Sequence, residues 1–261
     1  MTEEMLAGGV DNVGAVVRVG DTVRRPGGPA AAPVRAFLQH LDRVGFAGAP
    51  RFYGVDEQDR EVLDYMAGDV AVTPYPDWVA AEELLLSIAE LQRDLHAAAA
   101  GFELPDGMAW PARRLPTGAA GDLVCHADLC VENVVVRNGC AVAFIDFDLA
   151  TPADRLFDIA VAARHWIPLR DPRDITDARA DTDLMARFKA FTDVHGLSAD
   201  QRRQVIGMLG EFLDLALEST RKRAEAGHPG FARMWADGYE AMNRRSRTWL
   251  AHQATGRACT P

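Results

Sequence analysis

The stretch LVCHADLCVENVVV, from Leu123 to Val136, has apolar, strand-forming ends around a polar centre. That centre holds four side chains with hydrogen-bonding or metal-binding atoms: His126, Asp128, Glu132 and Asn133. Polar groups inside such a segment lower stability unless they are hydrogen-bonded or bound to a ligand. The placement therefore indicates either a structural polar network inside a hairpin or a site for chemistry.

The spacing of these residues favours the second interpretation. His126, Asp128 and Asn133 fit H-x-D-L-x-x-x-N, the kinase catalytic-loop pattern, with Ala127 where arginine is usual. One hairpin later an apolar strand ends in Asp146, where such an enzyme places its second metal-binding acid. Phosphoryl transfer needs a carboxylate beside the attacking hydroxyl and oxygen ligands for Mg²⁺. A tight loop before a hairpin can point Asp128, Asn133 and Asp146 into one pocket. Binding of metal and substrate there would offset the free-energy cost of burying these polar groups.

Here the chain resembles the aminoglycoside phosphotransferase family, a branch of the protein-kinase-like fold. The resemblance is strongest at HADLCVEN (126–133) and IDFD (145–148), continues through RLFDIA (155–160) and extends over most of the chain. The pair Leu95-His96, at the end of a long predicted helix, is also similar to the family. The resemblance implies an α+β, protein-kinase-like fold with two lobes: a small β-rich N-terminal lobe and a larger, mostly helical C-terminal lobe.

The same resemblance implies roles around the catalytic loop. Asp128 would orient or deprotonate the acceptor hydroxyl, and Asn133 and Asp146 would hold Mg²⁺. His126 would pack and hydrogen-bond within the loop, and Asp158 would support the loop from below.

The resemblance also implies a nucleotide site. The adenine of ATP, with GTP as an open alternative, would meet backbone groups at the hinge between the lobes, near Asp64, Tyr65 and Met66. A turn over residues 9–14 would cover the phosphates, although it lacks the G-x-G-x-x-G pattern.

The first lobe departs from the kinase pattern. Such kinases hold the nucleotide phosphates with a strand lysine paired to a helix glutamate, but the two lysines of this chain are Lys189 and Lys222. Arg24 or Arg25 occupies the matching strand, and strand alternation sends one of them inward. The helix predicted over residues 34–44 has no glutamate. Arginine binds phosphate bidentately, but its side chain is longer than that of lysine and ends in a planar group. The sequence is therefore consistent with catalysis in an altered geometry and with nucleotide binding without turnover.

Periodicity and turn signals predict the element order. The expected elements are a hairpin around Gly20-Asp21, a helix over 32–46, a strand pair over 51–66, a helix over 77–102 capped by Asp77, a hairpin around 137–139, and mostly helices after Asp154. The segment AGDVAVTPYP (67–76) breaks regular structure. We therefore predict an N-terminal nucleotide-binding lobe over residues 1–67 and a C-terminal catalytic and acceptor-binding lobe over residues 68–261.

Composition restricts the partners. The formal net charge is −10, so no nucleic-acid partner is expected, whereas a cationic small molecule would be attracted. No apolar stretch is long enough to span a bilayer, and the start MTEEML lacks signal-peptide features. Four cysteines without an export signal favour reduced thiols and a cytoplasmic location.

An acidic stripe is predicted on the helix over residues 201–227. Glu211, Asp214 and Glu218 follow one another at spacings of three and four. The stripe is either a recognition surface for a cationic acceptor or a solvated face on which Glu218 pairs with Lys222, and the spacing favours the solvated face.

These observations predict an ATP- and Mg²⁺-dependent phosphotransferase. The acceptor would be a hydroxyl of a small molecule, in the first place an aminoglycoside-like antibiotic or amino sugar, which makes antibiotic resistance the expected role. The alternative is a catalytically weak or inactive kinase-like nucleotide-binding module, because the lysine–glutamate pair is missing. A protein kinase is disfavoured because no A-P-E segment follows Asp146.

Overall fold

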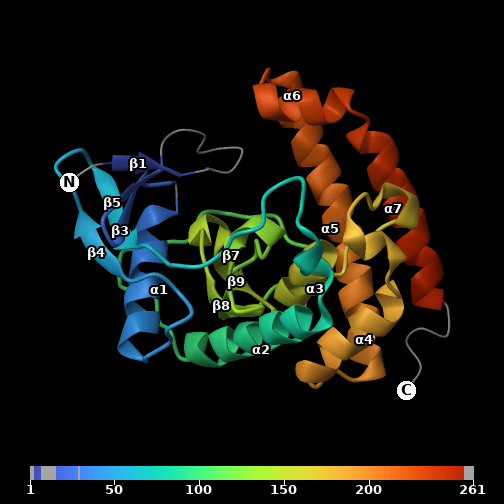
Figure 1. The fold of residues 1–261 in the computed structure, drawn as a ribbon, viewed down its shortest axis with the longest axis horizontal. Coiled ribbons are helices and arrows are strands. Elements are labelled where there is room, and N and C mark those ends of the chain that lie inside the picture. The colour runs from blue at the N-terminus through green and yellow to red at the C-terminus, as the bar shows by residue number, and fades with distance from the viewer. Residues whose placement is uncertain (1–2, 7–15, 29, 256–261) are drawn as a thin grey trace.

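The computed structural model describes residues 3–6, 16–28 and 30–255 of the chain. An N-terminal β-sheet and one helix stand beside a mostly helical C-terminal part, and two short strand pairs lie between them (Figure 1). This arrangement confirms the predicted α+β fold with a small β-rich N-terminal lobe and a larger helical C-terminal lobe.

The N-terminal sheet has five antiparallel strands in the order β1-β2-β3-β5-β4. Its strands are β1 (Glu3–Met5), β2 (Val17–Val19), β3 (Thr22–Pro26), β4 (Phe52–Val55) and β5 (Arg60–Asp64). The predicted turn Gly20-Asp21 joins β2 to β3, and Gly20 has a φ of 61°, which glycine adopts without strain. Because β3 pairs with β5, the sheet places residues from before and after the first helix directly opposite one another.

That helix, α1 (Ala31–Arg43), joins the sheet to the centre of the molecule. Its buried face carries Phe37, whose ring centroid lies 5.3 Å from that of Phe102 and 6.2 Å from that of Phe147. Phe147 directly follows the predicted metal ligand Asp146, so the packing of α1 helps to place this ligand.

Two strand pairs hold the ends of the catalytic-loop segment. Strand β6 (Leu123–Cys125) pairs with β9 (Thr151–Ala153), and β7 (Val134–Arg137) pairs with β8 (Cys140–Phe144). The β7–β8 turn has positive φ at Asn138 (52°) and Gly139 (77°), as predicted for this hairpin. Residues 126–133 therefore connect β6 to β7 while Asp146 lies between β8 and β9, which brings both parts of the motif to one place.

The C-terminal part is helical. The described residues form α2 (Glu82–Ala99), α3 (Arg155–Trp166), α4 (Leu184–Val194), α5 (Ala199–Glu225), α6 (Pro229–Ala236) and α7 (Tyr239–Thr255), with 3₁₀ turns at Asp77–Ala80, Val131–Asn133, Phe147–Leu149, Pro172–Asp174 and Ala178–Asp181. Helix α2 runs along the central strand pairs, and α5 lies alongside α7 at the opposite end of the molecule from the sheet (Figure 1). Helix α5 begins with a capping box in which Ser198 and Gln201 satisfy each other's backbone N–H groups.

Helix α2 begins later than predicted. Asp77 does not cap it: residues 77–80 form a separate 3₁₀ turn, and Ala81 is extended (φ −60°, ψ 134°). The reason is tertiary packing, because Val79 is buried and the carbonyl oxygen of Ala80 accepts a hydrogen bond from Arg187 Nη1 (2.8 Å). These contacts override the continuous helical pattern of the sequence.

The predicted boundary between residues 67 and 68 follows the end of β5. Just after it, the backbone N–H and carbonyl of Asp69 both pair with Val136 of β7, each at 2.8 Å, so the chain is already attached to the central strands. The exact division into two domains stays a prediction. Among the described residues, no helix combines the length and the apolar character that crossing a membrane requires.

The buried His195 makes the stability of the fold sensitive to acid. Neither ring nitrogen has a hydrogen-bond partner among the described residues, and burial lowers the pKa of His195 to about 3. The unfolded chain takes up this proton below about pH 6.5, whereas the folded protein takes it up only near the lowered pKa, so stability falls as the pH drops through that window.

We expect the free energy of unfolding to drop by about 2 kcal/mol between about pH 7.5 and pH 5 from this residue alone. In His195→Leu, urea unfolding at the two pH values should show a drop smaller by that amount. An identical drop in the variant and the wild type would contradict this assignment.

Candidate active site

Hydrogen bonds order the catalytic-loop segment and join it to the end of the following hairpin. Asn133 Nδ2 donates to the backbone oxygen (2.9 Å) and to the carboxylate Oδ2 (3.2 Å) of Asp128. His126 Nε2 donates to the backbone oxygen of Ile145 (2.9 Å), and the N–H of Ile145 donates to the backbone oxygen of Asn133 (3.0 Å). These bonds hold Asp128 beside Asn133 and tie the loop to the residue that precedes Asp146.

A cavity of about 410 Å³ lies between the N-terminal sheet and the central strands. We call it the interlobe cavity. Six residues of the predicted site line it: Arg25, Asp64, Tyr65, Met66, Asn133 and Asp146. Most of the other lining side chains are apolar, including Val16, Val23 and Leu63 of the sheet side and Val135 and Ile145 of the central strands. A volume of this size with apolar walls and a few convergent polar groups is typical of small-molecule sites. The predicted phosphate-covering turn over residues 9–14 lies outside the described residues.

Asn133 and Asp146 both line the interlobe cavity, and their side chains are of the kind that can bind a divalent cation. Carboxylate and amide oxygens are the ligands that Mg²⁺ prefers. Asn133 Nδ2 is held by Asp128, and within the described part of the chain no hydrogen bond reaches Asn133 Oδ1. Asp146 adopts a left-handed backbone conformation (φ 62°, ψ 64°), an uncommon one that is frequent at functional sites.

The Asp128 side chain is partly buried and has several charged groups near it. Burial raises the pKa of Asp128 and outweighs His126 and Arg113, whose charges lower it, while the charge of Asp146 adds to the rise. Asp128 does not line the interlobe cavity itself, but its hydrogen bond with Asn133 places it at the cavity's edge.

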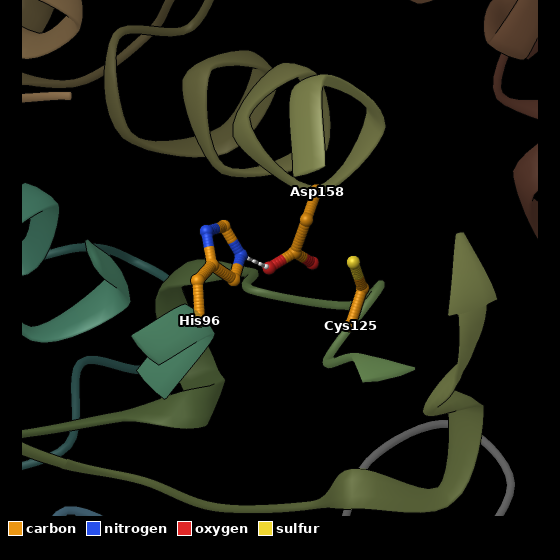
Figure 2. A group of neighbouring side chains, drawn as sticks. All are labelled: His96, Cys125 and Asp158. Carbon is orange, nitrogen blue, oxygen red and sulfur yellow. Dashed lines mark hydrogen bonds and ion pairs between the residues drawn. The ribbon is translucent and has the colours of Figure 1, made fainter. Parts of the chain in front are cut away.

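Asp158 is fully buried near the start of α3, and its carboxylate points toward His96 (Figure 2). Its Oδ2 accepts hydrogen bonds from His96 Nε2 (2.8 Å) and Gln92 Nε2 (3.0 Å) of α2, and its Oδ1 accepts one from the N–H of Ala127 (2.7 Å). Burial alone would raise the pKa of Asp158, but the hydrogen bonds from His96 and Gln92 and the charges of His96 and His126 together outweigh it, so the pKa is lowered. Since Ala127 has a φ of 60°, this bond fixes a strained residue directly before Asp128.

Asp158 also belongs to a cluster of three buried side chains whose spacing resembles that of a metal site. His96, Cys125 and Asp158 each offer a ligand atom within 4.8 Å of the others (Figure 2). However, both carboxylate oxygens of Asp158 already accept hydrogen bonds, and burial raises the pKa of the Cys125 thiol well above its ordinary value. Zinc requires the thiolate, so we interpret the group as structural support.

Arg25, rather than Arg24, reaches the interlobe cavity. Its guanidinium is buried and forms ion pairs with Glu61 (Nε–Oε2, 3.0 Å), Asp146 (Nη1–Oδ1, 3.0 Å) and Asp148 (Nη2–Oδ1, 2.6 Å). Strand alternation turns Arg24 to the other face, where Nη1 donates to Thr22 Oγ1 (2.6 Å).

Glu61 supplies the carboxylate that the first helix lacks. It lies in β5 directly opposite Arg25 of β3, is 2% exposed, and also accepts a hydrogen bond from Arg35 Nε of α1 (2.8 Å). The arginine–glutamate pair is thus formed between two strands. Glu61 could not be predicted from the sequence, because β3 and β5 are not consecutive strands and no local pattern shows that Arg25 and Glu61 face each other.

Asp148 and Arg113 are two further charged residues that the sequence did not assign. Asp148 stands two residues after Asp146, and burial raises its pKa, although the charge of Arg25 opposes the rise. Arg113 comes from the Pro- and Gly-rich segment before β6, and its Nη1 donates to the backbone oxygen of Leu149 (2.6 Å). Only the folded chain brings this segment to the residues after Asp146.

A second cavity, of about 600 Å³, adjoins the segment that follows Asp146. Residues 148–151 form one wall, residues 111–114 another, and part of α5 a third. We call it the α5 cavity. The two cavities lie on either side of one short segment, because Asp146 lines the interlobe cavity and Asp148 lines the α5 cavity.

The acidic stripe of α5 is engaged by the chain's own groups. Glu211 Oε2 accepts a hydrogen bond from the N–H of Thr117 (2.8 Å), and Asp214 pairs with Arg247 (2.9 Å). Glu218 lines the α5 cavity, and it pairs with Arg114 (2.8 Å) and Lys222 (2.7 Å). The structure thus contains the Glu218–Lys222 pair that the spacing favoured.

Comparisons with known proteins identify the family. Residues 102–191, which contain Asp128, Asn133, Asp146 and Asp158, match the phosphotransferase enzyme family. The trifolitoxin immunity protein of Rhizobium leguminosarum bv. trifolii is 31% identical over 248 residues, covering 91% of this chain and 91% of that protein. Streptomycin 3''-kinase of Streptomyces griseus is 29% identical over 201 residues, covering 74% of this chain and 60% of that protein.

A solved structure gives the same fold. A choline/ethanolamine kinase family protein from Mesorhizobium loti superposes with a TM-score of 0.64 at 18% identity, covering 98% of this chain and 93% of that one. The structural likeness extends over nearly the whole chain, and the sequence relative at 31% identity does so as well. The chain therefore belongs to the phosphotransferase enzyme family, as its resemblance to the aminoglycoside phosphotransferases predicted.

Proposed function

We propose that the protein transfers the γ-phosphoryl group of ATP to a hydroxyl group of a small molecule, with Mg²⁺ as the metal. One observation carries the proposal: Asn133 and Asp146 line the same cavity as the hinge residues 64–66, and Asp128 is hydrogen-bonded to Asn133. Phosphoryl transfer depends chiefly on positioning and charge stabilisation, and these residues offer both at one cavity. GTP in place of ATP is an alternative that nucleotide competition would decide.

In this proposal each residue has a definite task. Asp128 orients the acceptor hydroxyl and takes its proton, and Asn133 and Asp146 hold the metal. When bound, Mg²⁺ supplies positive charge that neutralises the phosphate oxygens. His126 and Asp158 keep the loop in place through the bonds described above, so that Asp128 needs little reorganisation during the reaction.

In this proposal Arg25 binds the nucleotide phosphates in place of the missing lysine. Among the described residues, Arg25 is the one basic residue that lines the interlobe cavity. Its Nε donates a hydrogen bond to Glu61, and its Nη1 donates one to Asp146. A guanidinium binds phosphate bidentately, and one anchored by a buried carboxylate is already oriented for this. The nucleotide phosphates would then replace part of its contact with Asp146 and Asp148.

Removing this charge should weaken nucleotide binding. We expect Arg25→Met to raise the Kd of Mg–ATP about 10- to 100-fold, the value of one or two charge-assisted hydrogen bonds. Arg24→Met, the adjacent residue on the opposite face, should leave the Kd unchanged. Calorimetric titration of both variants checks this, and a larger effect at Arg24 than at Arg25 would reverse the assignment.

The acceptor is the less defined half of the proposal. The identity with streptomycin 3''-kinase supports an aminoglycoside-like or other amino-sugar acceptor, and a role in antibiotic resistance would follow from it. The charged groups of the chain give this finer proposal little support, because Glu211, Asp214 and Glu218 are each paired with groups of the chain itself. A cationic acceptor and a cytoplasmic location stay predictions.

A coupled ADP-release assay tests the proposed function. The acceptor panel contains streptomycin, other aminoglycosides, choline, ethanolamine, amino sugars and hydroxy acids, each with Mg–ATP. Acceptor-dependent ADP release, with a matching gain of one phosphoryl group in the acceptor's mass, is the expected result. Mg–ATP binding without ADP release across the whole panel would favour the alternative, a kinase-like nucleotide-binding module.

A further inference from the structure

The α5 cavity is lined by more basic than acidic side chains. Its charged lining residues are Arg113, Arg114, Lys222, Arg223, Asp148 and Glu218. The protein as a whole carries a net charge of −10, so this local excess of positive charge runs against the composition of the chain. A charge at a cavity wall acts on a ligand more strongly than the distant average of the surface does.

The two acidic groups of the cavity are already engaged. Asp148 is paired with Arg25 of the N-terminal sheet (2.6 Å). Glu218 is shared by Arg114 (2.8 Å) and Lys222 (2.7 Å), so two cations at the cavity mouth have one carboxylate between them. Both carboxylates of the cavity are therefore paired with cations of the chain itself.

Arg113 is the inner cation of this cavity. It is half-buried, and among the described residues its guanidinium makes one hydrogen bond, to the neutral backbone oxygen of Leu149 (2.6 Å), and no ion pair. Burial lowers the pKa of Arg113, and the charge of Asp128 is the largest influence opposing this. A half-buried guanidinium with one hydrogen bond, to a neutral carbonyl, keeps most of its five N–H donors available to a ligand.

The position of Arg113 connects it to the chemistry. Leu149 ends the 3₁₀ turn that follows Asp146, so the guanidinium is fixed to the segment between the two cavities. Because Arg113 lines the α5 cavity and not the interlobe cavity, a group that it binds would lie apart from the proposed nucleotide site. The remainder of the wall includes apolar side chains, among them Phe212 and Leu215.

We propose that the α5 cavity binds an acceptor that carries an anionic group, a carboxylate in the first place, and that Arg113 binds this group. The inference rests on the proposed phosphotransferase function and refines its acceptor. The apolar wall suits an apolar body, so the acceptor class is a hydroxylated carboxylic acid with an apolar part rather than a polycationic amino sugar. Arg114 and Lys222, exposed at the mouth, would attract the anion before it reaches Arg113.

Matched pairs of ligands test this directly. The probes are N-benzoyl derivatives of serine, homoserine and threonine as free acids, and the same compounds as neutral primary amides, titrated into protein saturated with Mg²⁺ and a non-hydrolysable ATP analogue. We expect the acids to bind more tightly than the amides. In Arg113→Gln the acids should bind about 10- to 100-fold more weakly, while the amides should bind as before. Arg113→Lys should recover part of the acid preference, and Arg233→Gln, an exposed arginine of α6 outside both cavities, should change neither.

The outcomes separate this inference from the proposed function. Equal affinity for acids and amides, failure of all the acids to bind, or an acid preference that survives Arg113→Gln would each overturn the inference. The affinity for the Mg²⁺–nucleotide is measured in the same samples. If the wild type does not bind the nucleotide, the proposed function fails; if Arg113→Gln weakens nucleotide binding instead of acid binding, the guanidinium serves the phosphates and the inference fails alone.

Discussion

Replacing Asp128 with asparagine should lower kcat for phosphoryl transfer about 10²- to 10⁴-fold, the range that a positioned general base contributes. Asparagine has nearly the same shape as aspartate and can remain beside Asn133, but it cannot take a proton from the acceptor hydroxyl. A partly buried carboxylate opposes folding, so its neutral isostere should not lower the melting temperature. The Kd of Mg–ATP should change little, because Asn133 and Asp146 remain.

Steady-state assays with the best acceptor of the panel, together with thermal unfolding, check this expectation. Asp122→Asn is the matched control, since it removes an exposed carboxylate just before β6. It should leave kcat and stability unchanged. Turnover of Asp128→Asn equal to that of the wild type would exclude Asp128 from the chemistry.

Replacing Asp158 with alanine should cost about 3–5 kcal/mol in the free energy of unfolding, because each buried donor left without an acceptor costs about 1–3 kcal/mol. The substitution leaves His96, Gln92 and the N–H of Ala127 without their shared acceptor in the core. The pKa of Asp158 is lowered in the folded protein, so its contribution is complete above about pH 4 and is lost as the pH falls through the lowered value.

Asp154→Ala is the matched control on the same helix. Asp154 caps α3 by accepting the N–H of Leu156 (2.8 Å), and loss of such a cap costs about 1 kcal/mol. Urea unfolding at neutral pH compares the two variants. A loss at Asp158 no larger than the loss at Asp154 would show that the buried network contributes little to stability.

Much of the fold follows from local sequence signals. Gly20-Asp21 and Asn138-Gly139 form hairpin turns because glycine and asparagine accept positive φ there, and both hairpins were predicted. The pairing of β6 with β9 was not predicted, because strands of three residues carry little pattern and their partner lies beyond a hairpin. The start of α2 was wrong for a related reason: Arg187, remote in sequence, binds the carbonyl of Ala80.

In the candidate site too, some residues could be predicted from local sequence patterns and others could not. Asp128 and Asn133 could be predicted because the spacing of the catalytic loop is local, and Asp146 because it follows the strand one hairpin later. Asn133 and Asp146 line the interlobe cavity, and Asp128 is hydrogen-bonded to Asn133. Glu61 and Arg113 could not be found. Glu61 faces Arg25 only through the register of two non-consecutive strands, and Arg113 lies in a segment without periodicity whose position depends on the whole fold.

Calorimetric titration of ATP with and without Mg²⁺, in the wild type and in Asp146→Asn, tests the central claim independently of any acceptor. The claim is that Asn133 and Asp146 hold a divalent cation at the interlobe cavity, with Asp128 beside them. The account predicts that Mg²⁺ strengthens ATP binding to the wild type and that Asp146→Asn loses most of this gain. ATP binding that is equally strong without Mg²⁺, or a gain from Mg²⁺ that survives Asp146→Asn, would contradict it.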